Sequence, residues 1–364
     1  MSDMKDMIVE SVTKMLENYS TKEIVNDSEK GIWAKELWDS LAENGMLTVA
    51  VKEELGGTGG DYIDAFAILQ AAGKYAAPIP LAETYIANWL LAESGKQIQE
   101  GILTVAYEKE KTVFKLEKDG SGWIVSGKAA KVPWARYAEK VLALSESEEG
   151  SCLALIPLDQ AEIIHGKNMA GEARDEVIFK DAVVEECAII PVDKEEAAKK
   201  LLYMGALTRC VMMAGALEKA LETAVNHTKE RIQFGRPIHR FQAVQHHISA
   251  LAGEASAAAI AASYAVEKFQ EDPFAKEIAY AKTRINEAVG NANPVAHQVL
   301  AAIGFTYEHT LHHSTRRLWS WRDEFGTETE WEQIIADELL QLGKNELWDL
   351  ITGVKTKEVE VGNR

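Results

Sequence analysis

The chain has 364 residues, of which 47% are hydrophobic, and a formal net charge of −18. This length and apolar content are sufficient for a sizeable buried core divided among roughly two or three packed units. The negative charge argues against a nucleic-acid-binding or anionic-membrane-binding surface, because both require clustered lysine and arginine.

Cysteine usage and hydropathy indicate the compartment. Cys152, Cys187 and Cys210 are widely spaced in apolar surroundings and form no CxxC pair, which favours reduced core thiols. The first residues lack the pattern of a secretory signal, and no apolar run reaches the about 18 residues of a membrane span. We therefore expect a cytoplasmic protein without membrane insertion.

Residues 1–100 are predicted to form an N-terminal α-helical domain. The segment GIWAKELWDSLAENGML places Ile32, Leu37, Leu41 and Met46 at helical spacings. The stretch from 64 to 95 is typical of two helices that Pro78 and Pro80 separate.

Residues 101–195 are predicted to form a central antiparallel β domain. Apolar and polar residues alternate in TVFKLEKDGSGWIVSG, and Asp119-Gly120 within it is a hairpin signal. Short apolar runs such as KVLALS and CLALIPL add further strands.

Residues 196–364 are predicted to form a C-terminal helical bundle. Long helical patterns cover 200–230, 241–271 and 274–302, and shorter ones lie near 308–320 and 329–343. Alanine-rich segments such as ASAAAIAASYAV allow the close packing of roughly four antiparallel helices. The predicted fold class is therefore α+β.

The segment RIQFGRPIHRFQ, residues 231–242, separates two of the long helices. Arg231 ends the first helix, Phe234-Gly235 and Pro237 indicate a turn, and the second helix begins near Phe241. Guanidinium groups at such a turn suit a pyrophosphate, and the Gln242 amide can donate to the same ligand. The alternative is that Arg231 caps carbonyl groups and Gln242 faces water.

This turn, together with EELGGTGGDYIDAFAIL and AHQVLAAIGFTYEHTLHHSTRR, resembles the acyl-CoA dehydrogenase family over nearly the whole chain. The resemblance implies an N-terminal helical domain, a central β domain and a C-terminal four-helix bundle. It also implies α,β-dehydrogenation of acyl-CoA thioesters in lipid metabolism, with a glutamate base, FAD as hydride acceptor and an external electron-transfer acceptor.

The resemblance assigns cofactor contacts to several residues. Those that match contacts to the FAD of a neighbouring protomer are Arg231, Phe234, Gln242 and Gln298. Gly326 and Thr327 match the end of a Glu-Gly-Thr loop and are assigned to the cofactor site as well. The paired glycines that follow the glutamine in the family are Ala301 and Ala302 here, so we expect the backbone to approach the cofactor less closely than glycine would permit.

Other positions depart from the family pattern. The segment VAYEKEKTVFKL lacks a glycine-serine turn, and Lys131, Val132 and Pro133 replace the Trp-Ile-Thr that holds the flavin ring of the same chain. Of the two usual base positions, one is Phe325 and the other is Gly205, and neither can accept a proton. Glu324 and Asp323, beside the lost position, are the candidate replacements.

The retained and lost positions predict a subunit of a heteromer that completes its partner's flavin site, so that FAD is shared across a subunit interface. The alternatives are a non-catalytic structural subunit, or a homo-oligomeric dehydrogenase with an unusual base. His309, His312 and His313 with the adjacent Glu308 could coordinate zinc. Because HExxH is absent and the stretch matches a family helix, we expect no metal site.

Overall fold

The computed structural model describes residues 2–108, 113–120, 122–343 and 346–352. Its N-terminal part is helical, and a turn covering Pro78 and Pro80 separates its last two helices as predicted. The elements are α1 (Ser2–Tyr19), α2 (Lys22–Glu29), α3 (Lys35–Glu43), η1 (Glu53–Leu55), α4 (Tyr62–Lys74) and α5 (Leu81–Glu93). Leu37 and Leu41 of α3 are buried, whereas Ile32 precedes the helix and is 57% exposed, so its predicted place in the helix is wrong.

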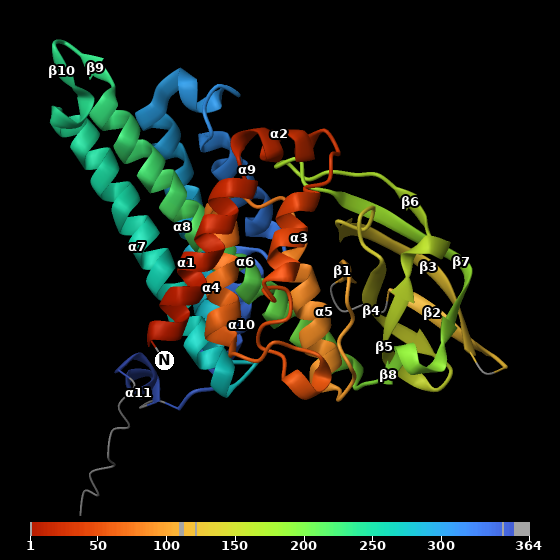
Figure 1. Cartoon of the computed structure of the whole chain (residues 1–364). Helices are drawn as coiled ribbons and strands as arrows, with labels where there is room; N and C mark the ends of the chain where they lie inside the picture. The colour runs from red at the N-terminus through yellow and green to blue at the C-terminus, as the bar shows by residue number, and fades with distance from the viewer. Residues whose placement is uncertain (1, 109–112, 121, 344–345, 353–364) are drawn as a thin grey trace, which may run out of the picture.

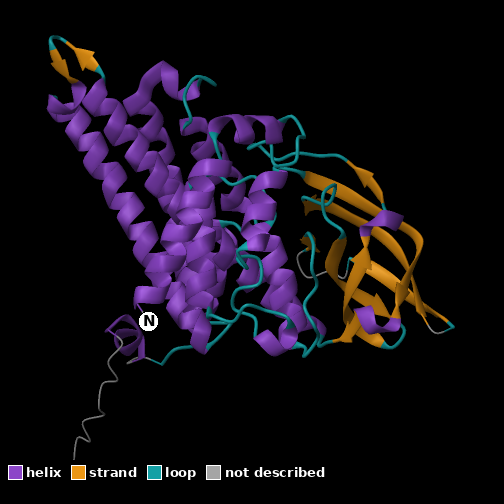
Figure 2. Cartoon of the chain, viewed as in Figure 1, coloured by secondary structure: helices purple, strands orange, loops and turns teal. Residues whose placement is uncertain are grey.

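The central part is a curved sheet beside the helices (Figure 2). Its strands are β1 (Leu103–Ala106), β2 (Phe114–Asp119), β3 (Gly122–Pro133), β4 (Lys140–Ser147), β5 (Gly150–Pro157), β6 (Glu162–Ile164), β7 (Arg174–Glu185) and β8 (Ile189–Pro191). Their order is β6-β7-β3-β2-β4-β5-β8, with β1 paired to β4. The predicted hairpin forms, because Asp119 pairs with Gly122.

The sheet is mainly antiparallel, as predicted, but β4 pairs in parallel with both β1 and β2. Alternation of apolar and polar residues shows that a strand has one buried face, and it carries no information about strand direction. The parallel pairs therefore could not be read from the pattern.

The C-terminal part is a bundle of long helices. Its elements are α6 (Lys194–Glu230), β9 (Ile232–Gln233), β10 (Arg236–Pro237), η4 (Ile238–Arg240), α7 (Gln242–Glu271), α8 (Lys276–Leu300), η5 (Ala301–Phe305), α9 (Leu311–Asp323), α10 (Glu328–Leu340) and α11 (Glu346–Thr352). One face of α7 is lined by small residues, among them Ala255, Ala258, Ala262 and Ala265, which are buried. Small side chains allow the close helix packing that the alanine content predicted.

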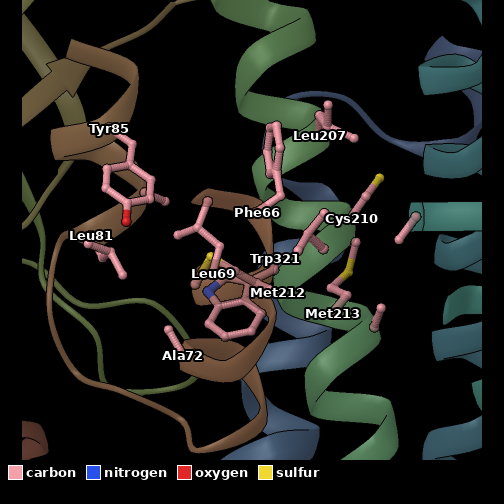
Figure 3. Close-up of a cluster of buried hydrophobic side chains, with 14 of the residues drawn as sticks. Phe66, Leu69, Ala72, Leu81, Tyr85, Leu207, Cys210, Met212, Met213 and Trp321 are labelled. Carbon is pink, nitrogen blue, oxygen red and sulfur yellow. The ribbon is translucent and has the colours of Figure 1, made fainter. Parts of the chain in front are cut away.

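The helix α6 forms the centre of the molecule, and α4 packs closely against it. A Cβ on Gly73 would lie 2.2 Å from the Met212 carbonyl oxygen, and one on Gly215 would lie 2.0 Å from that of Gln70. Both glycines are therefore required for the backbones to approach. Figure 3 shows the resulting core, in which Phe66 and Leu69 of α4 lie on one side of α6 and the Cys210 side chain points away from them on the other.

Among the described helices, α6 alone is long and apolar enough to cross a membrane by length and composition. Its most apolar window is 89% buried within the protein, as in the core helix of a folded domain. Cys152 and Cys210 are buried free thiols, as predicted. The Cys187 side chain lies outside the described part of the structure.

Candidate functional site

A cavity of about 680 Å³ lies where the sheet meets α9. Its walls include Tyr107 after β1, Lys131 and Pro133 at the end of β3, and the segment that follows α9. The structure thus brings together two segments that depart from the family pattern and the loop that carries one lost base position. Residues 109–112 of the first segment lie outside the described residues.

The Phe325 ring lies in this cavity wall and rests against Gly205 of α6. A Cβ on Gly205 would lie 2.1 Å from Phe325 Cδ1, which is closer than carbon atoms can approach. The ring also contacts Tyr107, with centroids 5.3 Å apart, and the Arg209 guanidinium, 5.5 Å from its centroid. The two usual base positions therefore touch each other, and an aromatic ring fills the space between them.

Glu324, one candidate base, is held in a buried ion-pair network. Arg174 Nη2 lies 2.7 Å from Glu324 Oε1, and Arg209 Nε lies 2.7 Å from Oε2. Burial alone would raise the Glu324 pKa, but the charges of Arg174 and Arg209 outweigh it and lower the pKa to about 2. A carboxylate with this pKa is a weak proton acceptor near neutral pH.

The network extends beyond the cavity. Arg209 also pairs with Glu83 of α5, and Arg174 Nη2 lies 3.2 Å from Glu172 Oε2. Nothing in the sequence indicated these partners, because Glu83, Arg174 and Arg209 come from separate parts of the chain. Asp323, the second candidate base, lines the cavity and is exposed.

Gly326 and Thr327 are placed at the start of α10 rather than in the cavity wall. Gly326 has φ of 101°, and a Cβ there would lie 2.5 Å from Trp331 Nε1. The Thr327 amide donates to Glu330 Oε2 over 2.8 Å, which closes the first turn of the helix. In this chain the two residues shape the loop and cap α10.

Arg231, Phe234 and Gln242 lie around a short hairpin that projects from the end of the bundle farthest from the central sheet (Figure 1). Phe234 and Gly235 have φ of 53° and 78°, as in the type I′ turn of a two-residue hairpin. Phe234 at the tip is 91% exposed, and Arg231 and Gln242 are exposed as well. The structure therefore separates these predicted cofactor contacts from the cavity of their own chain.

Gln298 lines a second hollow of about 550 Å³ at the end of α8, with Ala301 and Ala302. Trp319 borders both this hollow and the larger cavity. Ala301 has φ of 53° and ψ of −143°, a conformation that glycine adopts readily and alanine does not. The backbone here keeps a path suited to glycine although the side chain has changed.

Two family models match the N-terminal and the C-terminal helical parts of this chain. The family model "Acyl-CoA dehydrogenase, N-terminal domain" matches residues 2–101, and "Acyl-CoA dehydrogenase, C-terminal domain" matches residues 196–340. The chain is similar to the acyl-CoA dehydrogenase IpdE2 of Mycobacterium tuberculosis, with 24% identity over 312 residues that cover 85% of this chain and 88% of that protein.

Two further similarities involve proteins whose names describe assemblies. The caffeyl-CoA reductase–Etf complex subunit CarC of Acetobacterium woodii is 23% identical over 93% of this chain and 99% of its own length. The ChsE4–ChsE5 complex of Mycobacterium tuberculosis contains a chain that superposes with a TM-score of 0.84 at 22% identity, covering 93% of this chain and 98% of that one. The superposition establishes the fold.

Proposed function

Because this chain belongs to the acyl-CoA dehydrogenase family, we propose that it is one subunit of a cytoplasmic, FAD-dependent heteromer that oxidises an acyl-CoA thioester. Within it, this chain completes the flavin site of its partner. The reaction removes hydrogen from the α and β carbons, and FAD supplies the acceptor for the hydride when it is bound. An electron-transfer protein then accepts the electrons.

The observation that carries this proposal is the contact between Phe325 and Gly205. It fills both positions from which a family base would act, and neither side chain can remove a proton. The nearby Glu324 pairs with two arginines, which lower its pKa to about 2 and weaken it as a base. The cavity of this chain is therefore poorly suited to abstracting the α proton.

The residues of this chain suit FAD at the exposed hairpin, but those in its own cavity do not. Pro133 stands where the family has a hydroxyl, and its carbonyl oxygen accepts a hydrogen bond from Thr104. At the hairpin, by contrast, Arg231 offers an exposed guanidinium and Phe234 holds an exposed ring at a positive φ. An aromatic residue kept in this unfavourable conformation without burial suits a contact with another molecule.

The names of two similar proteins point in the same direction. One solved structure is a complex of ChsE4 with ChsE5, and CarC is a subunit of a reductase–Etf complex. These assemblies support pairing with a second acyl-CoA dehydrogenase subunit and with an electron-transferring flavoprotein.

The first test is the visible spectrum of the protein purified alone and after co-expression with each genomic neighbour, both supplied with FAD. We expect a colourless isolated protein and a yellow complex. Arg231→Ala should remove flavin from the complex, whereas Arg240→Ala, which changes an exposed arginine of the adjacent η4, should retain it.

About one flavin per chain in the isolated protein would overturn the heteromer proposal and favour the homo-oligomeric dehydrogenase. Asp323→Asn and Glu324→Gln would then be assayed for loss of acyl-CoA-dependent flavin reduction. Asp323 is the observation that favours this second candidate, because it is an exposed carboxylate in the cavity wall. If the partner alone keeps full flavin and activity, this chain is a non-catalytic structural subunit.

A further inference from the structure

Glu29, at the end of α2, lies beside two histidines at the start of α9. One possible ligand atom from each of Glu29, His312 and His313 lies within 4.8 Å of the other two. The two imidazole rings are 4.3 Å apart between centroids. Both histidines are buried, at 6% and 4% exposure, so the cluster is part of the protein interior.

The hydrogen bonding of His312 leaves one nitrogen available. Its Nδ1 lies 2.7 Å from the His309 carbonyl oxygen, and since a carbonyl oxygen only accepts, Nδ1 carries the proton. Nε2 is therefore a lone-pair acceptor, and it is buried without a hydrogen-bond partner among the described residues. A buried polar atom in this state is costly unless a ligand satisfies it.

His313 is oriented in the same manner by α2. Its Nε2 lies 2.8 Å from Asn26 Oδ1, so Nε2 donates to the amide oxygen and Nδ1 keeps its lone pair. Histidines that bind metals commonly donate their other ring N–H to a neutral oxygen or a carboxylate, which fixes the tautomer and the ring orientation. Both histidines of this cluster have that second partner.

Glu29 completes the set with a charged oxygen ligand. Arg316 Nη1 contacts its two carboxylate oxygens at 3.0 and 2.9 Å, which leaves other lone pairs available. A second arginine nearby, Arg317, faces Glu172 with Nε and Oε1 3.3 Å apart. Each guanidinium thus has a carboxylate within ion-pair distance, and Arg317 Nε and Nη2 form no hydrogen bond among the described residues.

We propose that Glu29, His312 and His313 bind a divalent transition metal, with Zn²⁺ as the best fit, and that the metal ties α2 to α9. Two imidazoles and one carboxylate suit Zn²⁺ and its neighbours rather than Mg²⁺ or Ca²⁺, which require mostly oxygen ligands. The sequence paired these histidines with Glu308, and the absence of HExxH argued against a site. Folding supplies Glu29 instead, from a helix near the other end of the chain.

The test uses the full-length protein without an affinity tag, treated with chelator and then dialysed against Zn²⁺. We expect one tightly bound Zn²⁺ per chain by elemental analysis, and a higher melting temperature with Zn²⁺ than without. His312→Ala and Glu29→Gln should abolish both effects, and Asn26→Ala should weaken binding by roughly tenfold. The matched control is His246→Ala, which removes an exposed histidine of α7 and should leave binding unchanged.

Substitution of Co²⁺ for Zn²⁺ gives an independent readout, because its visible absorption reports coordination by nitrogen and oxygen ligands. Absence of bound Zn²⁺ in the wild-type protein would overturn the proposal. So would undiminished binding by both His312→Ala and Glu29→Gln, since the metal would then occupy surface histidines. Use of Glu29→Gln as a second variant guards against misfolding of the histidine variant.

Discussion

At the residue scale, the ring of Phe325 and the missing side chain of Gly205 depend on each other. Restoring a side chain at 205 would force the ring out of place, because a Cβ there lies 2.1 Å from Phe325 Cδ1. A side chain added at position 205 alone therefore costs stability before it can supply a base. The contact explains in physical terms why the Phe325 ring requires glycine at position 205.

We expect Gly205→Ala to lower the free energy of unfolding by about 2 kcal/mol, as overpacking of a core does. In a Phe325→Ala background the same change should be neutral or stabilising by up to about 1 kcal/mol, the helix preference of alanine over glycine. Urea unfolding of the four proteins gives the coupling free energy. Gly253→Ala in α7, where a Cβ meets nothing within 4 Å, is the control and should stabilise. Additive effects at 205 and 325 would contradict the contact.

A second residue-scale prediction concerns Ala301, whose φ of 53° and ψ of −143° favour glycine. Ala301→Gly should raise the free energy of unfolding by about 1 kcal/mol, because it relieves backbone strain. Ala302→Gly should not stabilise, because Ala302 is not among the residues with positive φ. Thermal and urea unfolding of both variants would decide, and equal effects would show that the strain is absent.

At the scale of elements, the hairpin β9–β10 changes the chain direction between α6 and α7 and exposes an aromatic tip. The positive φ values of Phe234 and Gly235 close the turn, and the Phe234 ring lies 6.0 Å from that of Phe241. Because Phe234 is 91% exposed, it adds little to the stability of its own chain. Its exposed position is what the proposed contact with the flavin of a partner requires.

Phe234→Ala should change the free energy of unfolding of the isolated chain by less than about 0.5 kcal/mol, as exposed substitutions do. In the heteromer it should weaken FAD binding by roughly 3- to 10-fold, the loss of one aromatic contact of about 1 kcal/mol. Flavin fluorescence during FAD titration measures this. Met7→Ala, which changes another exposed apolar residue at 71% exposure, should leave FAD affinity unaltered; an equal loss there would rule out a specific contact.

At the scale of the whole molecule, the buried ion pairs join parts of the chain that are distant in sequence. Glu83 of α5, Arg209 of α6, Glu324 after α9 and Arg174 of β7 form one continuous set. Removal of one member leaves a buried charge without its partner, which is more destabilising than loss of a surface pair. The network therefore couples the N-terminal helices, the sheet and the bundle.

This network predicts a pH dependence of stability. The Glu324 pKa is about 2 in the folded protein, compared with 4.5 ordinarily, so folding favours the ionised form. Its stabilising contribution, up to about 3 kcal/mol, is present above pH 4.5 and is lost as the pH falls toward 2. The stability difference between wild type and Glu324→Gln should shrink over that window. Urea titrations at stepped pH values measure the difference, and a constant value would contradict the proposed pairing.

The sequence by itself determined the order of helical, β and helical parts, the break at Pro78 and Pro80, and the turn after Arg231. Each depends on local signals, because the hydrophobic period and the positions of proline and glycine are set by residues close together in the sequence. The lost base positions Phe325 and Gly205 were also visible as residue identities. Their contact was not, because residues 120 positions apart meet only when the chain folds.

Tertiary structure alone decided the rest. The parallel pairing of β4 with β1 and β2 depends on how the strands assemble, and the residue pattern within one strand carries no information about it. The pairing of Glu324 with Arg174 and Arg209 makes a candidate base an ion-paired carboxylate with a lowered pKa, because that pKa depends on charges brought close by folding. In the same way Glu29, rather than Glu308, came to lie beside His312 and His313. Spacing along a chain shows which groups are available, and only packing shows which of them meet.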